Sequence, residues 1–97
     1  MTDVTLLYFD GCPNWGTTDR QLRELQAEIG FSLGHVQVET AEQAQRLGFV
    51  GSPTVLVDRT DPFAKGDMPA GLACRLYATP DGLQGSPTLE QLREVVA

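Results

Sequence analysis

The stretch Leu6-Leu7-Tyr8-Phe9-Asp10-Gly11-Cys12-Pro13-Asn14-Trp15 decides how this chain folds. The apolar run from Val4 to Phe9 predicts a buried strand, Asp10-Gly11 predicts a tight turn, and Cys12 begins a helical pattern. Pro13 suits the first helical position, because its missing N–H would have no partner there. A cysteine at a helix N-cap lies beside unpaired backbone N–H groups and the positive end of the helix dipole, which favour the thiolate. We therefore expect Cys12 to be a reactive thiol.

Composition and charge limit the classes of function. The 97 residues predict one domain, over residues 1–97, with a single core. The net charge of −6 and the scattered Lys and Arg residues argue against a nucleic-acid partner. No apolar segment approaches membrane-spanning length, and Met1-Thr2-Asp3 lacks the basic residues of a secretory signal. We therefore expect a cytoplasmic protein with reduced thiols and no membrane partner. Nothing in the composition indicates an oligomeric state.

The rest of the chain alternates further strands and helices. After the helix that Cys12 opens, the patterns predict strand, helix, strand, strand and helix, at His35–Glu39, 41–47, Val55–Asp58, Leu72–Tyr77 and a last helix that follows Thr88. The spacings Thr40 to Gln43 and Thr88 to Gln91 predict a capping box at the start of each of the two later helices. The strand over 72–77 follows its predecessor through the loop 59–71 without an intervening helix, which favours antiparallel pairing. Periodicity assigns surface or core roles to four residues that could also border a site, namely Asp61, Phe63, Arg75 and Tyr77.

A resemblance to a known family follows from two motifs. Cys12-Pro13-Asn14-Trp15 at the start of a helix, with Ser52-Pro53-Thr54 before a later strand, resembles a short thioredoxin- or glutaredoxin-like member of the thioredoxin-like superfamily over nearly the whole chain. The resemblance implies an α/β three-layer sandwich of order βαβαββα, in which a mixed four-stranded sheet has helices on both faces. It also implies that Cys12 is the nucleophile and that Pro53 is a cis-proline opposite it. The implied substrate groove, in which the Ser52 backbone pairs with an extended substrate, is lined by Pro13, Trp15, Ser52 and Pro53.

The chain departs from the family pattern at the second cysteine. Trp15 stands where a dithiol enzyme has its resolving cysteine, and the Gly-Gly-x-Asp segment by which glutaredoxins hold glutathione is missing. Cys12 could therefore be resolved only by Cys74 or by an external thiol. In the antiparallel pairing Cys74 lies about three residues, on the order of 10 Å, from the level of Pro53. Because a disulfide needs Cα atoms within ~7 Å, we expect Cys74 to be a small apolar core residue, with a second or resolving thiol as the alternative.

Other assignments stay open between two interpretations. Trp15 is either the first core residue of its helix or a surface on which substrate stacks. Cys12 is either reactive or a half-buried thiol that caps the helix, and the charge of Asp10 disfavours its thiolate.

The leading prediction is a monothiol thiol–disulfide oxidoreductase in which Cys12 forms a mixed disulfide with a small-molecule thiol or a protein disulfide. A second class is a non-catalytic thioredoxin-like binding or accessory module, which the missing motif cysteine favours. A more remote alternative is a soft-metal or organomercurial thiol site that uses Cys12, Cys74 and an acid such as Asp10. No ligand spacing predicts a resident metal or an organic cofactor.

Overall fold

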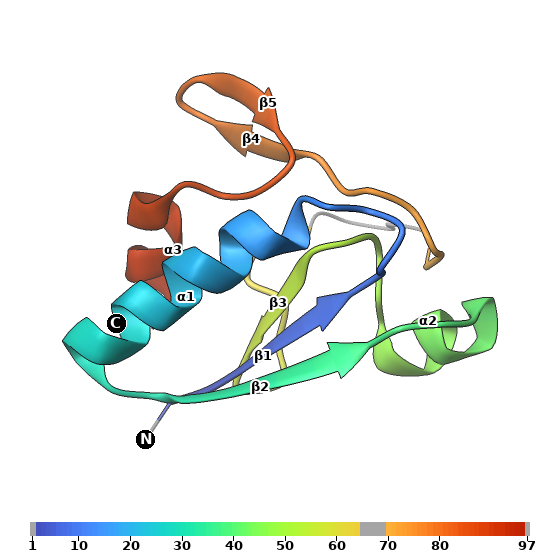
Figure 1. The fold of residues 1–97 in the computed structure, drawn as a ribbon, viewed down its shortest axis with the longest axis horizontal. Coiled ribbons are helices and arrows are strands. Elements are labelled where there is room, and N and C mark those ends of the chain that lie inside the picture. Colours follow the sequence, from blue (N-terminus) through green and yellow to red (C-terminus); the bar gives the residue numbers. More distant parts are fainter. Residues whose placement is uncertain (1, 65–69, 97) are drawn as a thin grey trace.

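The structure is a computed structural model that describes residues 2–64 and 70–96. Within these residues the chain forms three helices and two β-sheets (Figure 1). In chain order the elements are β1 (Asp3–Tyr8), α1 (Trp15–Ile29), β2 (Ser32–Gln37), α2 (Ala41–Leu47), β3 (Thr54–Val57), β4 (Tyr77–Thr79), β5 (Gly82–Gln84) and α3 (Leu89–Val96).

The larger sheet has the strand order β2-β1-β3, with β1 in the centre. β1 runs parallel to β2 and antiparallel to β3, so the sheet is mixed, as expected. The strand expected at His35–Glu39 is β2, which begins earlier, at Ser32, and lies at the sheet edge. Alternate residues of β1 face opposite sides of the sheet, and both sides are buried, since Leu6 and Leu7 are at most 1% exposed.

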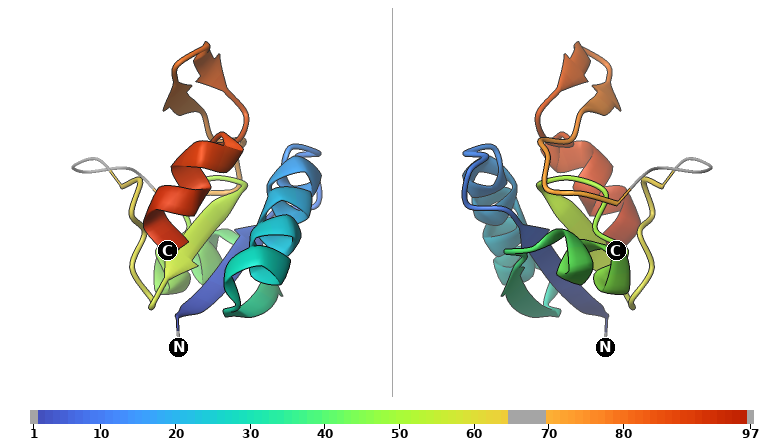
Figure 2. Two further views of the ribbon diagram at one scale, coloured as in Figure 1. Left: turned by 90° about the vertical axis from the view of Figure 1, so that its left-hand side faces the viewer. Right: turned by 90° about the vertical axis from the view of Figure 1, so that its right-hand side faces the viewer.

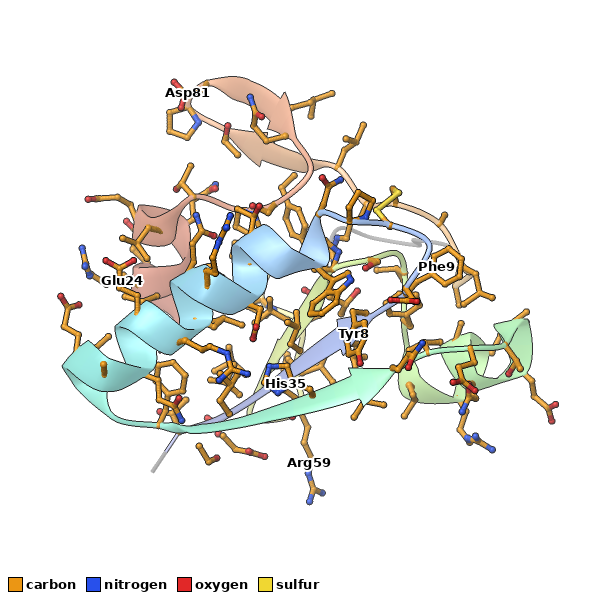
Figure 3. The ribbon with its side chains drawn as sticks, viewed as in Figure 1. Tyr8, Phe9, Glu24, His35, Arg59 and Asp81 are labelled. Atoms are coloured by element: carbon orange, nitrogen blue, oxygen red, sulfur yellow. A yellow bond between two sulfur atoms is a disulfide. The ribbon has the colours of Figure 1, made fainter. Side chains whose placement is uncertain are left out.

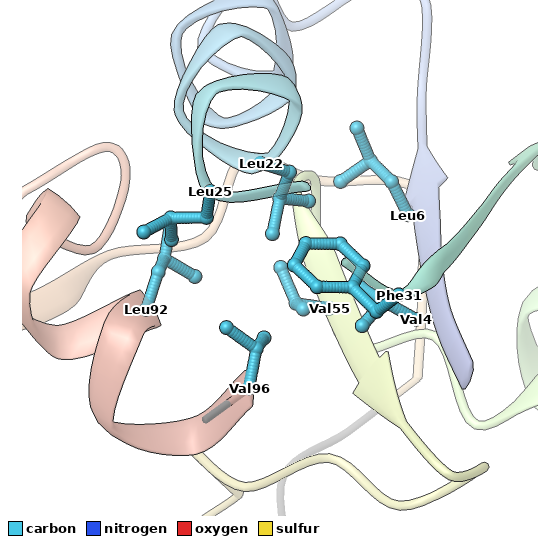
Figure 4. Packing of buried hydrophobic residues seen from close by; sticks show 8 residues of the cluster. All are labelled: Val4, Leu6, Leu22, Leu25, Phe31, Val55, Leu92 and Val96. Carbon is cyan, nitrogen blue, oxygen red and sulfur yellow. The ribbon is translucent and has the colours of Figure 1, made fainter. Parts of the chain in front are cut away.

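Helices cover both faces of this sheet, which confirms the expected layering (Figure 2). On one face α1 and α3 pack on β1 and β3 around a first core, shown in Figure 4: Val4, Leu6, Leu22, Leu25, Phe31, Val55, Leu92 and Val96. On the other face α2 contributes to a second, smaller core: Leu7, Val38, Ala44 and Phe49. Burial of these apolar surfaces is the main favourable term in folding.

The polar starts of two helices agree with the sequence patterns. Thr40 caps α2 through a capping box with Gln43, in which each side chain bonds to the backbone of the other residue. Thr88 and Gln91 make the same reciprocal pair at the start of α3. The inward face of α2 is narrow, because Ala41 and Leu47 are exposed and Ala44 is its only buried residue.

The start of α1 differs from the prediction. The helix begins at Trp15, with Asn14 as its N-cap, so neither Cys12 nor Pro13 occupies the expected position. The Cys12 N–H donates to the carbonyl oxygen of Phe9 at 3.0 Å, which closes the turn before the helix. Cys12 therefore lies in this turn, outside the first helical turn where the dipole acts most strongly.

The expected fourth strand of the main sheet does not form in the described residues. Instead of pairing antiparallel with β3, the 72–77 segment makes one isolated parallel bridge, between Cys74 and Ser52. Its last residue, Tyr77, begins β4, which pairs with β5 in a separate hairpin. Local pairing across the Thr79–Gly82 turn thus takes the place of long-range pairing. The hairpin projects away from the main sheet (Figure 2).

Among the described residues, no helix combines the length and the apolar character that crossing a membrane requires.

Two positions on one helix test the first core. Leu25 is fully buried, whereas Ile29, one turn further along the same helix, is 39% exposed at the end of α1. Leu25→Ala should lower the free energy of unfolding by about 2–5 kcal/mol, because it leaves a cavity. Ile29→Ala should cost less than about 1 kcal/mol. Urea unfolding of both variants measures these losses, and equal losses would show that α1 packs differently.

Candidate functional site

The two cysteines are joined by a disulfide bond, Cys12–Cys74, with their Cα atoms 5.7 Å apart. This separation lies in the usual range for a disulfide. Figure 3 shows the bond in yellow at the end of the molecule where Phe9 lies. The expectation that Cys74 lies too far away was wrong, because it assumed antiparallel pairing with β3. The parallel bridge to Ser52 brings Cys74 level with the residue that precedes Pro53.

Ser52 positions both cysteine-bearing segments. Its N–H donates to the Ala73 carbonyl at 2.7 Å, and its own carbonyl accepts from the Arg75 N–H at 3.0 Å. Its side-chain Oγ accepts from the N–H of Phe9 at 3.1 Å, at the end of the strand that leads to Cys12. Ser52 is fully buried. Its backbone is therefore already paired within the chain, and the expectation that it pairs with an extended substrate was wrong.

The neighbours of Ser52 permit this close approach. A Cβ on Gly51 would lie 2.8 Å from the Cβ of Arg75, and the φ of Gly51 is +130°, a region that side chains disfavour. The Ser52–Pro53 peptide bond is cis, as expected. The carbonyl of Pro53 accepts the hydroxyl proton of Tyr77, and the carbonyl of Gly51 accepts from Thr54 Oγ1 at 2.6 Å. Three successive carbonyls, at residues 51–53, are thus satisfied by the chain itself.

The two sulfur-bearing residues differ in exposure. Cys12 is fully buried, whereas Cys74 is an exposed residue. The amide Nδ2 of Asn14 donates toward the Cys12 Sγ at 3.7 Å, and the Ser52 carbonyl oxygen lies 3.8 Å from the same sulfur. When the pair is reduced, that carbonyl can accept the Cys12 thiol proton, and the Asn14 amide can stabilise the thiolate.

The residues expected to line a substrate groove are not all accessible. Ser52 and Pro53 are buried, whereas Pro13 is exposed. Trp15 is half-buried against the first core, and its ring stacks on Tyr8 with centroids 4.3 Å apart. The core interpretation of Trp15 therefore accounts for its observed contacts.

A buried ion pair next to Cys74 was not predicted. Arg75 Nη1 lies 2.7 Å from Asp61 Oδ2, and the Arg75 side chain is 2% exposed. The guanidinium lies 4.5 Å from the centroid of the Tyr77 ring, which meets Phe63 edge to face. These contacts fasten the 61–64 loop to the cysteine-bearing segment. One signal in the sequence could have indicated this pair, namely the opposite charges of Asp61 and Arg75 on the two sides of the loop.

Tyr77 is a neutral donor. Burial raises the pKa of Tyr77 above its ordinary value, an effect that the nearby charge of Arg75 opposes and that of Asp61 reinforces. The hydroxyl therefore keeps its proton and its hydrogen bond to Pro53.

Metal binding finds no support in the described part of the chain, where no group of three or more His, Cys, Asp or Glu residues could hold an ion. The third ligand that Asp10 was expected to add to the two cysteines is thus not found there.

Comparison of the chain with protein-family models, curated proteins and solved structures gives no match, so the function is argued from the site.

The Tyr77 hydroxyl links stability to pH. The native state holds this proton at pH values where the unfolded chain, with a tyrosine pKa near ~10, releases it. Above pH ~10 this group should therefore lower the free energy of unfolding by about 1.4 kcal/mol per pH unit. Tyr77→Phe should remove this slope and, by leaving the Pro53 carbonyl unpaired, cost about 1–3 kcal/mol at neutral pH.

Denaturant unfolding of both proteins between pH 8 and pH 11 measures this difference, with Tyr8→Phe as the matched control. An unchanged slope in the Tyr77 variant would show that another group titrates.

Proposed function

We propose that this protein exchanges thiols and disulfides through a two-cysteine pair, Cys12 and Cys74. The observation that carries the proposal is the bond between a buried and an exposed cysteine beside the cis-Pro53 turn. This revises the one-cysteine mechanism expected from the motif, because an internal partner for Cys12 is within bonding distance.

The difference in exposure assigns the two roles. Cys74 is the sulfur that an external thiolate attacks, and Cys12 is the leaving group. In reduction, the attacking thiolate forms a bond to Cys74 Sγ while the Cys12–Cys74 bond breaks, and the Cys12 thiolate takes up a proton. A second thiolate then attacks the external sulfur of the mixed disulfide, which releases an oxidised small-molecule disulfide and the Cys74 thiolate.

The reverse sequence oxidises the pair. The Cys74 thiolate attacks a small-molecule or protein disulfide, a mixed disulfide forms on Cys74, and the first thiolate leaves and is protonated. Cys12 then loses its proton and attacks Cys74 Sγ, which closes the internal disulfide and releases the second thiol. The two electrons and two protons lost by the pair appear in the two thiols released. The Asn14 amide, 3.7 Å from Cys12 Sγ, supports the thiolate in this step.

Backbone contacts favour fast closure of the internal disulfide. Both sides of Cys74 are held on Ser52, by Ala73 and Arg75, and the Arg75–Asp61 ion pair adds a side-chain anchor. These contacts do not depend on the disulfide, so the sulfurs should stay close after reduction. Holding two reacting groups in position lowers the entropic part of the barrier.

The same features also support a thioredoxin-like arrangement of the site. A strand, a turn with Cys12 and a helix lie beside the cis-Pro53 turn, and Cys74 supplies from a distant segment the partner sulfur that the residue-15 position lacks. The small-molecule thiol and the protein disulfide remain the two classes of substrate in this proposal.

One observation favours a second candidate, a binding module with a structural disulfide. The bond spans 62 positions of sequence, and a loop of that length is expected to stabilise a fold by about 4 kcal/mol through the unfolded state. In that case the bond would resist exchange, and its reduction would lower stability.

Single-cysteine variants test the roles. After treatment with an oxidised small thiol, Cys12→Ser, which keeps the exposed Cys74, should accumulate a stable mixed disulfide. Cys74→Ser, which keeps the buried Cys12, should react at least about tenfold more slowly, since access limits attack on a buried thiol. The reduced wild-type protein should end as the internal disulfide. Intact-mass spectrometry distinguishes the three products.

Faster adduct formation in Cys74→Ser than in Cys12→Ser would reverse the two roles. If small thiols do not exchange with the wild-type disulfide under native conditions, and stronger reduction lowers the melting temperature, the structural module is the better description.

A further inference from the structure

A pocket of about 340 Å³ adjoins the segment that carries Cys74. It is enclosed by the 62–64 loop, the chain from Arg75 to Ala78, the β4–β5 hairpin and α3. Its lining residues are Pro62, Phe63, Ala64, Arg75, Leu76, Tyr77, Ala78, Leu83 and Gln91. The volume falls at the lower end of the range for small-molecule sites.

The pocket offers apolar surface at its mouth. Leu76 and Leu83 line it and are 62% and 69% exposed, the two most exposed large hydrophobic residues among those described. Apolar side chains that line a concave site are typical of small-molecule pockets.

The polar side chains of the lining already have partners within the chain. The charge of Arg75 is paired with Asp61, and the Tyr77 hydroxyl is bonded to Pro53. Gln91 uses its Nε2 on the Ala78 carbonyl and its Oε1 on the Thr88 N–H. Arg75 Nε has no partner among the described residues, but the atom is buried, so it offers no accessible donor to a ligand in the pocket. An anionic ligand would find no unpaired positive charge there and would lose hydration.

The outward side of the cysteine segment leads to this pocket. Exposure alternates along it, because Cys74 and Leu76 are exposed while Arg75 and Tyr77 are buried. Residues two apart in an extended segment point to the same side, about 7 Å from each other. A group attached to Cys74 Sγ is therefore within a few bond lengths of Leu76 and the mouth of the pocket.

We infer that this pocket binds the substituent of the disulfide that reacts with Cys74, and that it selects low-molecular-weight disulfides with uncharged, apolar substituents. The inference rests on the proposed exchange function and names its substrate class. In the exchange, the Cys74–S–S–R bond forms, the RS–SR bond breaks, and the apolar group R lies against Leu76 and Leu83. A hydrophilic or anionic thiol of the same size gains nothing from these walls.

Two isosteric oxidants test the inference on the reduced full-length protein. Dipropyl disulfide and bis(2-hydroxyethyl) disulfide differ by a methyl in place of a hydroxyl on each arm. Formation of the internal disulfide is followed by mass spectrometry after acid quench, and the ratio of the two second-order rate constants is divided by the same ratio for dithiothreitol. The wild-type protein should favour the propyl compound by about fourfold or more, the effect of burying one carbon group.

Leu83→Glu should abolish this preference, because it places a hydrated carboxylate at the mouth of the pocket. Since both oxidants are uncharged, the new charge alters the reactivity of Cys74 toward both alike, and the ratio isolates the pocket. The matched control is Ile29→Glu, which adds the same charge at an exposed apolar position at the far end of α1 and should keep the wild-type ratio. Thermal unfolding verifies that both variants fold.

Three outcomes are distinguishable. A wild-type preference that is lost in Leu83→Glu and kept in Ile29→Glu supports the inference. A wild-type ratio equal to that of dithiothreitol, or a ratio unchanged by Leu83→Glu, overturns the pocket while the exchange function stands. Failure of the reduced protein to react with either oxidant overturns both.

Discussion

Ser52 is the residue on which the geometry of the site depends. Its backbone N–H, its carbonyl and its hydroxyl oxygen all bond to distant parts of the chain, and the residue is fully buried. Each such bond adds only about 1 kcal/mol of net stability, but leaving a buried group unpaired costs about 1–3 kcal/mol. Alternative registers of the Cys74 segment would leave several groups unpaired together. This cost of unpaired buried groups exceeds the net contribution of any one bond. It therefore keeps the two sulfurs at bonding distance.

Local signals in the sequence predicted much of the fold. The central apolar strand and the two capping boxes depend on a few neighbouring residues, and all are present. The cis configuration of Pro53 is also present, but it was expected only from the resemblance that the Ser52-Pro53-Thr54 motif carries. The start of α1 was placed two residues too early, because a proline is compatible both with a first helical turn and with the turn that precedes it. The helix dipole therefore acts less strongly on Cys12 than expected. The group that donates toward its sulfur is the Asn14 side-chain amide.

The position of Cys74 could not be predicted in the same way. The sequence predicts Cys74 as a core residue, which would put the side of the 72–77 segment that carries this cysteine inward. In the structure Arg75 and Tyr77 point inward instead. A buried arginine is tolerated only with a partner, and its partner, Asp61, lies across a loop where no periodic pattern indicates contact. Because the sequence pattern does not reveal this ion pair, the prediction turned the wrong face of the segment inward. The predicted role of Cys74 was wrong for the same reason.

The disulfide also changes the connectivity of the molecule. It closes residues 12–74 into a covalent ring, to which β1 is attached at one end and the hairpin and α3 at the other. Cleavage of any one peptide bond inside the ring leaves the two pieces joined, and the strands and helices on either side can remain packed. A cut between β4 and α3, outside the ring, would instead leave the C-terminal fragment with no covalent link to the rest of the molecule. In the oxidised protein, the tolerance of the backbone to cleavage thus differs between the two sides of residue 74.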